Sequence, residues 1–201
     1  LTIQAMSGLM STTGERDGRP LKAGVPVADF MSGAHLYGAI TTALFEREHT
    51  GIGRVVEVSM LESMYATLLP SAGHAYASKH VPSRSGNRHV ADSYVPLDTF
   101  EASAGWVSVV CATDDHWLKL TKAMGRTDLH DDEKLRHLNG RIDAIEEVTA
   151  AVAEWAAAHT REEISALCEL HRIPSVPLRD VVEVLADPHL RPGASPDAQA
   201  E

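Results

Sequence analysis

One carboxylate stands out among the residues whose types and spacing could do chemistry. Asp29 lies in the run "VPVADFMSG", residues 25–33, in which every other residue is apolar or small. An aspartate at the start of a helix accepts hydrogen bonds from first-turn amides, and the helix dipole favours its ionised form. Such a carboxylate can also attack an activated acyl group when small neighbours let a substrate approach. The residues alone leave both interpretations of Asp29 open, a helix cap and a nucleophile.

The other reactive side chains form no recognisable catalytic or metal-binding motif. Cys111 and Cys168 lack the C-x-x-C spacing of zinc and redox sites, and the eleven histidines include no H-E-x-x-H pattern. The sequence also has no G-x-S-x-G elbow and no glycine-rich phosphate loop. Asp114 and Asp115 begin a predicted helix, where they complement its dipole. We therefore expect no metal in the protein.

The segments around Asp29 must position it. Residues 11–28 are rich in Gly, Pro and small polar residues, which predicts a loop of a length that is often functional. Apolar residues at helical spacing predict a helix over residues 30–48. A short strand is expected at 55–58, and an S-x-x-E capping motif predicts the next helix over 60–69.

A second structural unit is expected after a polar, Pro- and Gly-punctuated linker at 70–87. Its predicted elements are a β-hairpin made by strands within 93–102 and 105–112, then helices over 114–124, 141–158, 161–171 and 181–185. Thr113 and Thr160 are the expected N-caps of two of these helices. Residues 88–186 therefore predict a small α+β domain, and residues 187–201 an exit linker or tail.

Charge and hydropathy exclude several classes of partner. Lys and Arg number 18 against 28 Asp and Glu, and the net charge of -10 argues against nucleic-acid binding. No apolar run approaches the roughly 20 residues of a membrane helix, so we expect no membrane partner. Two cysteines that form no disulfide framework are typical of a reducing compartment, which predicts a cytoplasmic location. The sequence starts at Leu1 rather than Met, in the middle of a continuous residue pattern, so we expect a further segment upstream.

Four segments, taken in order, resemble the family III CoA transferases, also called the CaiB/BaiF family, which includes formyl-CoA transferase and is related to α-methylacyl-CoA racemase. They are "QAMSGLMSTTGERDGRPLKAGVPVADFMSG", "ALFEREHTGIGRVVEVSMLESM", "GNRH" and "RIPSVPLRDVVEVLADPHL". The similarity runs from Gln4 to Leu190. Ordered similarity over this span is more specific than any single motif.

The resemblance implies an α/β fold. The chain is expected to be a middle part of the family III CoA-transferase fold, of the interlocked-dimer type. Residues 1–69 would be a portion of the large domain with the catalytic Asp loop, and 88–186 the small α+β domain. The resemblance implies that the family's N-terminal Rossmann-like region, which carries most CoA contacts, is expected to have no counterpart in this sequence. The implied partner is a second copy of the chain in an interlocked homodimer.

The resemblance also implies a reaction. Asp29 stands in the place of the family's aspartate nucleophile, which attacks an acyl-CoA thioester and becomes an anhydride and then an aspartyl-CoA thioester. The implied substrates are a coenzyme A thioester and a carboxylic acid acceptor. A helix-cap role is compatible with this role of Asp29. The glycine-rich loop of formyl-CoA transferase is replaced here by Arg88–Ala91.

Two alternatives to a CoA transferase stay open. The related racemases use an aspartate at the same place for proton transfer, with a glutamate near the position of Asp114 and a histidine upstream. Asp114 is one methylene shorter than that glutamate, and the upstream histidine would precede this chain. A noncatalytic remnant or interaction module is the third hypothesis, since an absent domain would leave apolar surface exposed.

Overall fold

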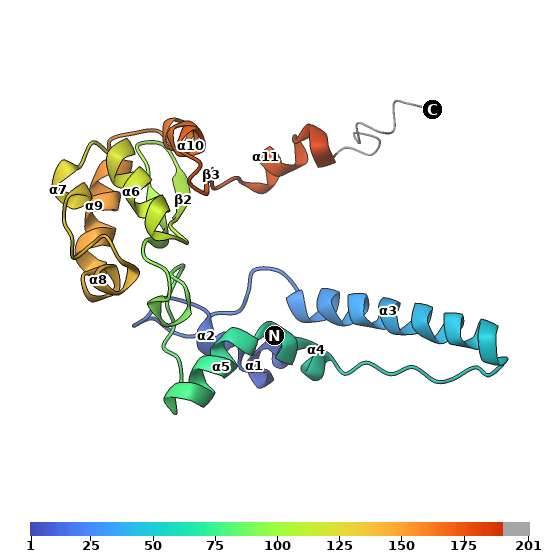
Figure 1. The fold of residues 1–201 in the computed structure, drawn as a ribbon. Coiled ribbons are helices and arrows are strands. Elements are labelled where there is room, and N and C mark those ends of the chain that lie inside the picture. The colour runs from blue at the N-terminus through green and yellow to red at the C-terminus, as the bar shows by residue number, and fades with distance from the viewer. Residues whose placement is uncertain (191–201) are drawn as a thin grey trace. The chain divides into compact units, whose positions relative to one another are not determined.

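The computed structural model describes residues 1–190 and divides the chain into two compact units, with the division between Ser93 and Tyr94 (Figure 1). The first unit is helical, and the second combines helices with a small antiparallel sheet. The chain therefore has the expected mixed α/β character. The tail predicted at 187–201 lies largely outside the described residues.

The long helix α3 dominates the first unit. It spans Val27–Thr50 and ends at Gly51, whose φ of 72° is the left-handed conformation that a glycine adopts at low cost. Two short helices, α1 (Thr2–Met6) and α2 (Leu9–Thr12), precede it, and residues 13–26 connect them to α3. The predicted loop and the predicted helix are confirmed, but the helix begins three residues earlier than expected.

The strand predicted at 55–58 does not form. Residues 52–59 run without regular structure from the end of α3 to α4 (Met60–Thr67), as Figure 1 shows. Val55 is 89% exposed, so its β-branched side chain has no sheet to pack on. β-propensity describes how well a residue fits a half-buried pleated surface, and the first unit contains no strand in its described residues to provide one.

Helix α4 begins as its capping motif predicts, because the Ser59 side chain accepts a hydrogen bond from the Glu62 amide at 3.3 Å. The stretch expected as a linker at 70–87 is only partly irregular. Residues Leu69–Ser78 form helix α5, with a proline in its first turn where the ring is tolerated. A 3₁₀ turn, η1 (Val90–Asp92), lies close to the end of the unit.

The sheet of the second unit has the order β1-β2-β3 and is antiparallel throughout. The predicted hairpin is confirmed by β1 (Leu97–Glu101) and β2 (Trp106–Val110), with Phe100 opposite Val107. The third strand, β3 (Ser175–Pro177), was not predicted. It is short, follows Pro174 and ends at Pro177, so it has little of the alternation that marks a strand.

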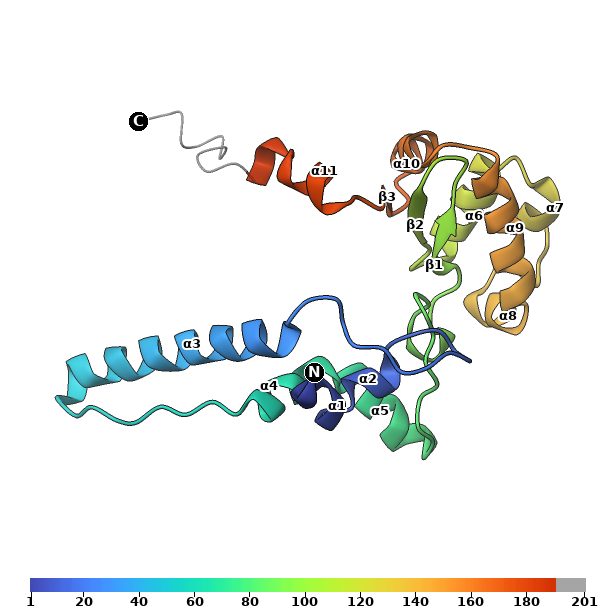
Figure 2. The same ribbon diagram turned by 180° about the vertical axis from the view of Figure 1, so that it is seen from behind.

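Helices pack on this sheet and on each other to form the core (Figure 2). They are α6 (Asp114–Ala123), α7 (Thr127–His130), α8 (Leu138–Asp143), α9 (Ile145–Ala157) and α10 (Arg161–Leu170). The exposed helix α11 (Val181–Leu185) and the 3₁₀ turn η2 (Pro188–Leu190) follow, and no residue of α11 belongs to the core. Thr113 and Thr160 cap α6 and α10 as predicted. The single helix expected over 141–158 is interrupted at Ala144, which leaves helical geometry with φ -112° and ψ 28°.

Arg141 is a buried cation at the centre of the second unit. Its side chain is 1% exposed, and its guanidinium donates to the carbonyls of Val95 (2.8 Å), Leu135 and Arg136 (both 3.0 Å). It also donates to Asp114 Oδ1 at 2.9 Å. These bonds join the segment before β1, the segment before α8 and the start of α6. Arg141 therefore holds together parts of the unit that are distant in sequence.

Candidate functional site

Asp29 lies in the first turn of α3 and is exposed. The helix begins at Val27 with Pro26 at the N-cap position, and no side chain caps it. The expectation that Asp29 precedes the helix and acts as its N-cap is therefore wrong. The Asp29 amide instead donates to the Pro26 carbonyl at 3.1 Å. The carboxylate still lies where the positive end of the helix dipole stabilises a negative charge.

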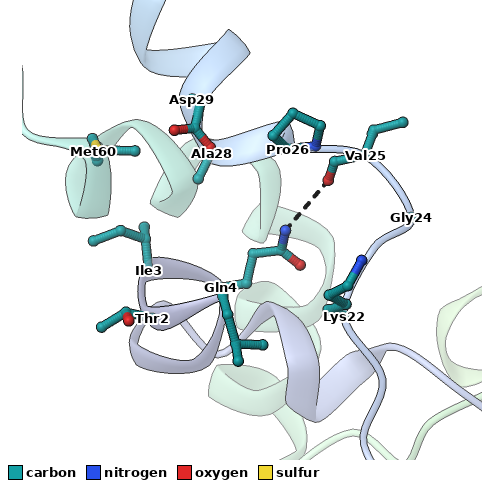
Figure 3. A pocket seen from close by; sticks show the side chains of 11 residues that line it. Thr2, Ile3, Gln4, Lys22, Gly24, Val25, Pro26, Ala28, Asp29 and Met60 are labelled. Atoms are coloured by element: carbon teal, nitrogen blue, oxygen red, sulfur yellow. Dashed lines mark hydrogen bonds between the residues drawn. The ribbon is translucent and has the colours of Figure 1, made fainter.

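Asp29 lines a pocket of about 420 Å³ within the first unit (Figure 3). The wall is built from α1, the end of the loop over 13–26, the first turn of α3 and Met60 at the start of α4. This volume lies in the range of small-molecule sites, about 300–1,000 Å³. The pocket therefore places Asp29 beside a space that a small substrate can enter.

Gln4 fixes the loop that leads to Asp29. Its side chain is buried, with the residue 5% exposed. The amide oxygen accepts from the Ala23 backbone at 2.9 Å, and the amide nitrogen donates to the Val25 carbonyl at 3.4 Å, the bond dashed in Figure 3. Both ends of one side chain thus bind the loop just before α3. No local pattern of residues predicts this role, because the bonded residues are far from Gln4 along the chain.

A second set of hydrogen bonds holds the middle of the same loop. The Arg84 guanidinium donates to the backbone carbonyls of Glu15 (3.1 Å), Arg16 (3.4 Å) and Gly18. Arg16 in turn pairs with Asp92 at 3.1 Å. The segment over 84–92 therefore anchors the loop over 13–18. The stretch Arg88–Ala91 belongs to this anchoring segment.

Two side chains that line the pocket carry formal charge, Asp29 and Lys22. The Lys22 ammonium donates to the Ala23 carbonyl at 3.3 Å, and no carboxylate within residues 1–190 pairs with it. A lysine has three donors, so two of them are left for other acceptors. The pocket therefore combines one anion and one cation on a largely uncharged wall.

The small residues that follow Asp29 leave room beside it. The Ser32 hydroxyl is buried and donates to the Ala28 carbonyl at 2.7 Å, so it is used within the helix. A Cβ added at Gly33 would meet no atom within 4 Å. Open space at Gly33 agrees with the expectation of a small-residue surface, but no contact in the described residues requires glycine there.

Asp114 belongs to the second unit and accepts hydrogen bonds from two side chains. It accepts from Arg141 at 2.9 Å and from His137 Nδ1 at 3.1 Å. Desolvation raises the pKa of the Asp114 carboxyl, but the hydrogen bonds from His137 and Arg141 more than offset this and lower it below its ordinary value. A carboxylate of low proton affinity is a poor proton carrier near neutral pH, which argues against a racemase role for Asp114.

Neither cysteine has the environment of a reactive thiol. Cys111 and Cys168 are both free and buried. Desolvation raises the pKa of the Cys111 thiol to about 12 and also raises the pKa of Cys168. Across residues 1–190, no three His, Cys, Asp or Glu side chains gather as a metal ion would need, and no helix is long and apolar enough to cross a membrane.

Comparisons with known proteins identify relatives over nearly the whole chain. A succinyl-CoA:mesaconate CoA-transferase from Haloarcula marismortui is 33% identical over 190 residues, covering 94% of this chain and 47% of the relative. A succinate–glutarate CoA-transferase from Agrobacterium fabrum is 30% identical over 200 residues, covering 99% of this chain and 50% of the relative. The chain thus spans about half the length of the curated relatives it matches.

Comparison with solved structures agrees with the comparison of sequences. The crystal structure of a CaiB/BaiF family protein from Brucella suis superimposes with a TM-score of 0.78 at 31% identity, covering 98% of this chain and 50% of that one. The model of CoA-transferase family III matches residues 1–195. The resemblance recognised in the four ordered segments is confirmed, and the chain belongs to CoA-transferase family III.

Proposed function

We propose that this chain takes part in the transfer of CoA between carboxylic acids, with Asp29 as the nucleophile. The observation that carries the proposal is the position of Asp29: an exposed carboxylate in the first turn of α3, lining a pocket of about 420 Å³, in a chain of this family. The relatives' names add support, since each is called a CoA-transferase.

The proposed first half of the reaction moves CoA onto Asp29. An Asp29 oxygen attacks the thioester carbonyl of an acyl-CoA, the C–S bond breaks, and CoA leaves as the thiolate. This step forms a mixed anhydride between Asp29 and the acyl group. The thiolate then attacks the Asp29 carbonyl carbon, and the anhydride C–O bond breaks. The first acid departs as a carboxylate, and Asp29 holds CoA as a thioester.

The second half returns CoA to a new acid. The acceptor carboxylate attacks the Asp29 thioester carbonyl and expels the thiolate, which then attacks the acceptor's carbonyl in the second anhydride. The products are the new acyl-CoA and the restored Asp29 carboxylate. No oxidant, reductant or proton donor is needed. Each addition develops an oxyanion, and our candidate donor to it is the backbone amide of Ala28, a residue of the first turn of α3 that lines the pocket.

The substrates we propose are a CoA thioester and a small carboxylic acid acceptor. The acids in the two relatives' names are mesaconate, succinate and glutarate, which are all dicarboxylic acids. A pocket of about 420 Å³ accommodates acids of this size. We assign no further cofactor to the reaction, because the transfer steps need none.

We also propose that the working form is an interlocked homodimer in the cytoplasm. Helix α3 exposes large apolar side chains along its length, including Phe30, Tyr37 and Phe45. An apolar surface of this kind marks a protein–protein interface. The free, buried state of both cysteines agrees with a reducing compartment.

The test uses the protein at its full natural length, with succinyl-CoA as donor and glutarate as acceptor. We expect glutaryl-CoA to form, and Asp29→Asn to lower kcat by at least about 1,000-fold, as the loss of a nucleophile does. Asp17→Asn is the matched control, because Asp17 is an exposed aspartate of the preceding loop that does not line the pocket. It should leave the rate unchanged.

Two results would contradict the proposal, and each would favour one of the alternatives. Epimerisation of a 2-methylacyl-CoA without any CoA transfer would identify a racemase. A protein that carries out neither reaction, with any acid tried, would identify the noncatalytic module.

A further inference from the structure

We infer that Lys22 recognises the second carboxylate of a dicarboxylic acid bound in the Asp29 pocket, and so sets the preference for dicarboxylic over monocarboxylic substrates. The inference rests on the proposed function for the identity of the reacting group, Asp29. It adds Lys22 as a residue that determines substrate specificity. It concerns only the first unit, in which the pocket and both charged side chains lie.

The charge of the pocket supports this role. Lys22 is the only cationic side chain among those that line it, in a protein whose net charge is -10. A dicarboxylate must bring two negative charges into a site that already contains a carboxylate. Without a cation in the wall, the protein's own charge would oppose that binding. Lys22 is the group on the described wall that can offset it.

The hydrogen bonds of Lys22 leave it available to a ligand. Its ammonium uses one donor, toward the Ala23 carbonyl at 3.3 Å, and pairs with no carboxylate in the described chain. Most surface cations near carboxylates find a partner, as Arg16 does with Asp92 and Arg54 does with Glu46. Lys22 therefore keeps the two donors that a carboxylate can accept.

The backbone at Lys22 is held in place. Ala23, the next residue, donates its amide to Gln4 Oε1 at 2.9 Å, and the other end of the Gln4 amide binds Val25. Figure 3 shows Lys22 and Asp29 at different points of the wall, with Gln4 between them. Because both side chains line the same pocket, a diacid that reacts at Asp29 through one carboxylate can present the other to Lys22. A fixed loop lowers the entropy cost of this arrangement.

The experiment compares succinate with butyrate, which has the same carbon chain but one carboxylate. Equilibrium binding of each acid is measured calorimetrically on the full-length protein, and then each acid is supplied as CoA acceptor. We expect Lys22→Met to weaken binding and kcat/KM for succinate by about 10-fold, the loss of one charge-assisted hydrogen bond at an exposed site. Butyrate should be unaffected. Lys22→Arg should keep the preference for succinate.

Lys79→Met is the matched control, because Lys79 ends α5, outside the pocket, and should change neither acid. The inference is overturned if Lys22→Met weakens both acids equally, which indicates a structural role. It is also overturned if Lys22→Met weakens CoA itself and leaves the succinate preference intact, which assigns Lys22 to a CoA phosphate. Asp29→Asn separates the two proposals: it should abolish transfer while the Lys22-dependent preference in binding persists.

Discussion

Asp114 shows how one residue links the charge of the second unit to its stability. Desolvation raises its pKa, and the hydrogen bonds from His137 and Arg141 lower it more strongly, so the folded carboxyl has a pKa below the unfolded value of 3.8. A depressed folded pKa contributes stability that is present above the unfolded value. That contribution is lost as the pH falls below about 4 toward the folded pKa.

Asp114→Asn should therefore reduce the acid sensitivity of the second unit. We expect the variant to be less stable than the wild type near pH 7, with a smaller further loss of unfolding free energy on acidification to about pH 3. Urea unfolding followed by tryptophan fluorescence measures this, because all three tryptophans lie in the second unit. Asp115→Asn, beside it on α6, is the control. Equal acid sensitivity in the Asp114→Asn variant and the wild type would contradict the account.

At the residue scale, the sequence reveals some of the candidate site and hides the rest. Asp29 could be singled out because one charge interrupts an apolar run and because ordered segments around it resemble a family. Gln4 and Arg84 could not. They act through hydrogen bonds to backbone groups far along the chain, and such bonds leave no local pattern of residue types.

At the scale of elements, the loop over 13–26 depends on two side chains from outside it. Arg84 binds the carbonyls of Glu15, Arg16 and Gly18, and Gln4 binds the residues just before α3. A loop of this length has few buried apolar contacts of its own. The hydrogen bonds from Arg84 and Gln4 are therefore the main interactions that keep it ordered.

Arg84→Ala should loosen the loop without unfolding the chain. We expect hydrogen exchange of the amides over 13–21 to rise about 10-fold or more, since several hydrogen bonds of about 1 kcal/mol each are lost. Arg54→Ala provides the comparison, because Arg54 pairs with Glu46 on α3 and makes no bond to this loop. Unchanged exchange over 13–21 in the Arg84→Ala variant would show that the loop is held by other contacts.

Local signals predicted those elements whose boundaries are set locally. The caps at Thr113 and Thr160 are confirmed because a capping side chain binds an amide within its own turn. The strand at 55–58 was wrong because pairing needs a partner strand, which propensity cannot supply. The strand β3 could not be predicted from its own residues, which include and follow a proline. It forms because its backbone pairs with β2.

At the scale of the whole chain, the two units differ sharply in how much apolar surface they bury. In the second unit, 18 buried hydrophobic residues form one cluster, which includes Trp117, Leu120 and Ile164. In the first unit, the buried hydrophobic residues are Ala28 and Met64. Hydrophobic burial is the main favourable term in folding, so the second unit has its own core and the first does not.

A fragment of residues 94–190 should therefore fold by itself. We expect it to unfold cooperatively, with a urea midpoint close to that of the same transition in the longer chain. A fragment of residues 1–93 should show little protection from hydrogen exchange. Circular dichroism and tryptophan fluorescence report the first result. A 94–190 fragment that unfolds without cooperativity would contradict the assignment of an independent core.

The acyl-accepting role of Asp29 is the central claim, and trapping its intermediate tests it most directly. The full-length protein is incubated with succinyl-CoA, treated with hydroxylamine, digested, and analysed by peptide mass spectrometry. An anhydride or thioester at Asp29 reacts with hydroxylamine to give an aspartyl hydroxamate. The account predicts this modification at Asp29, dependent on succinyl-CoA and absent from Asp29→Asn. CoA transfer that proceeds with Asp29 unmodified, or a hydroxamate at another carboxylate, would contradict it.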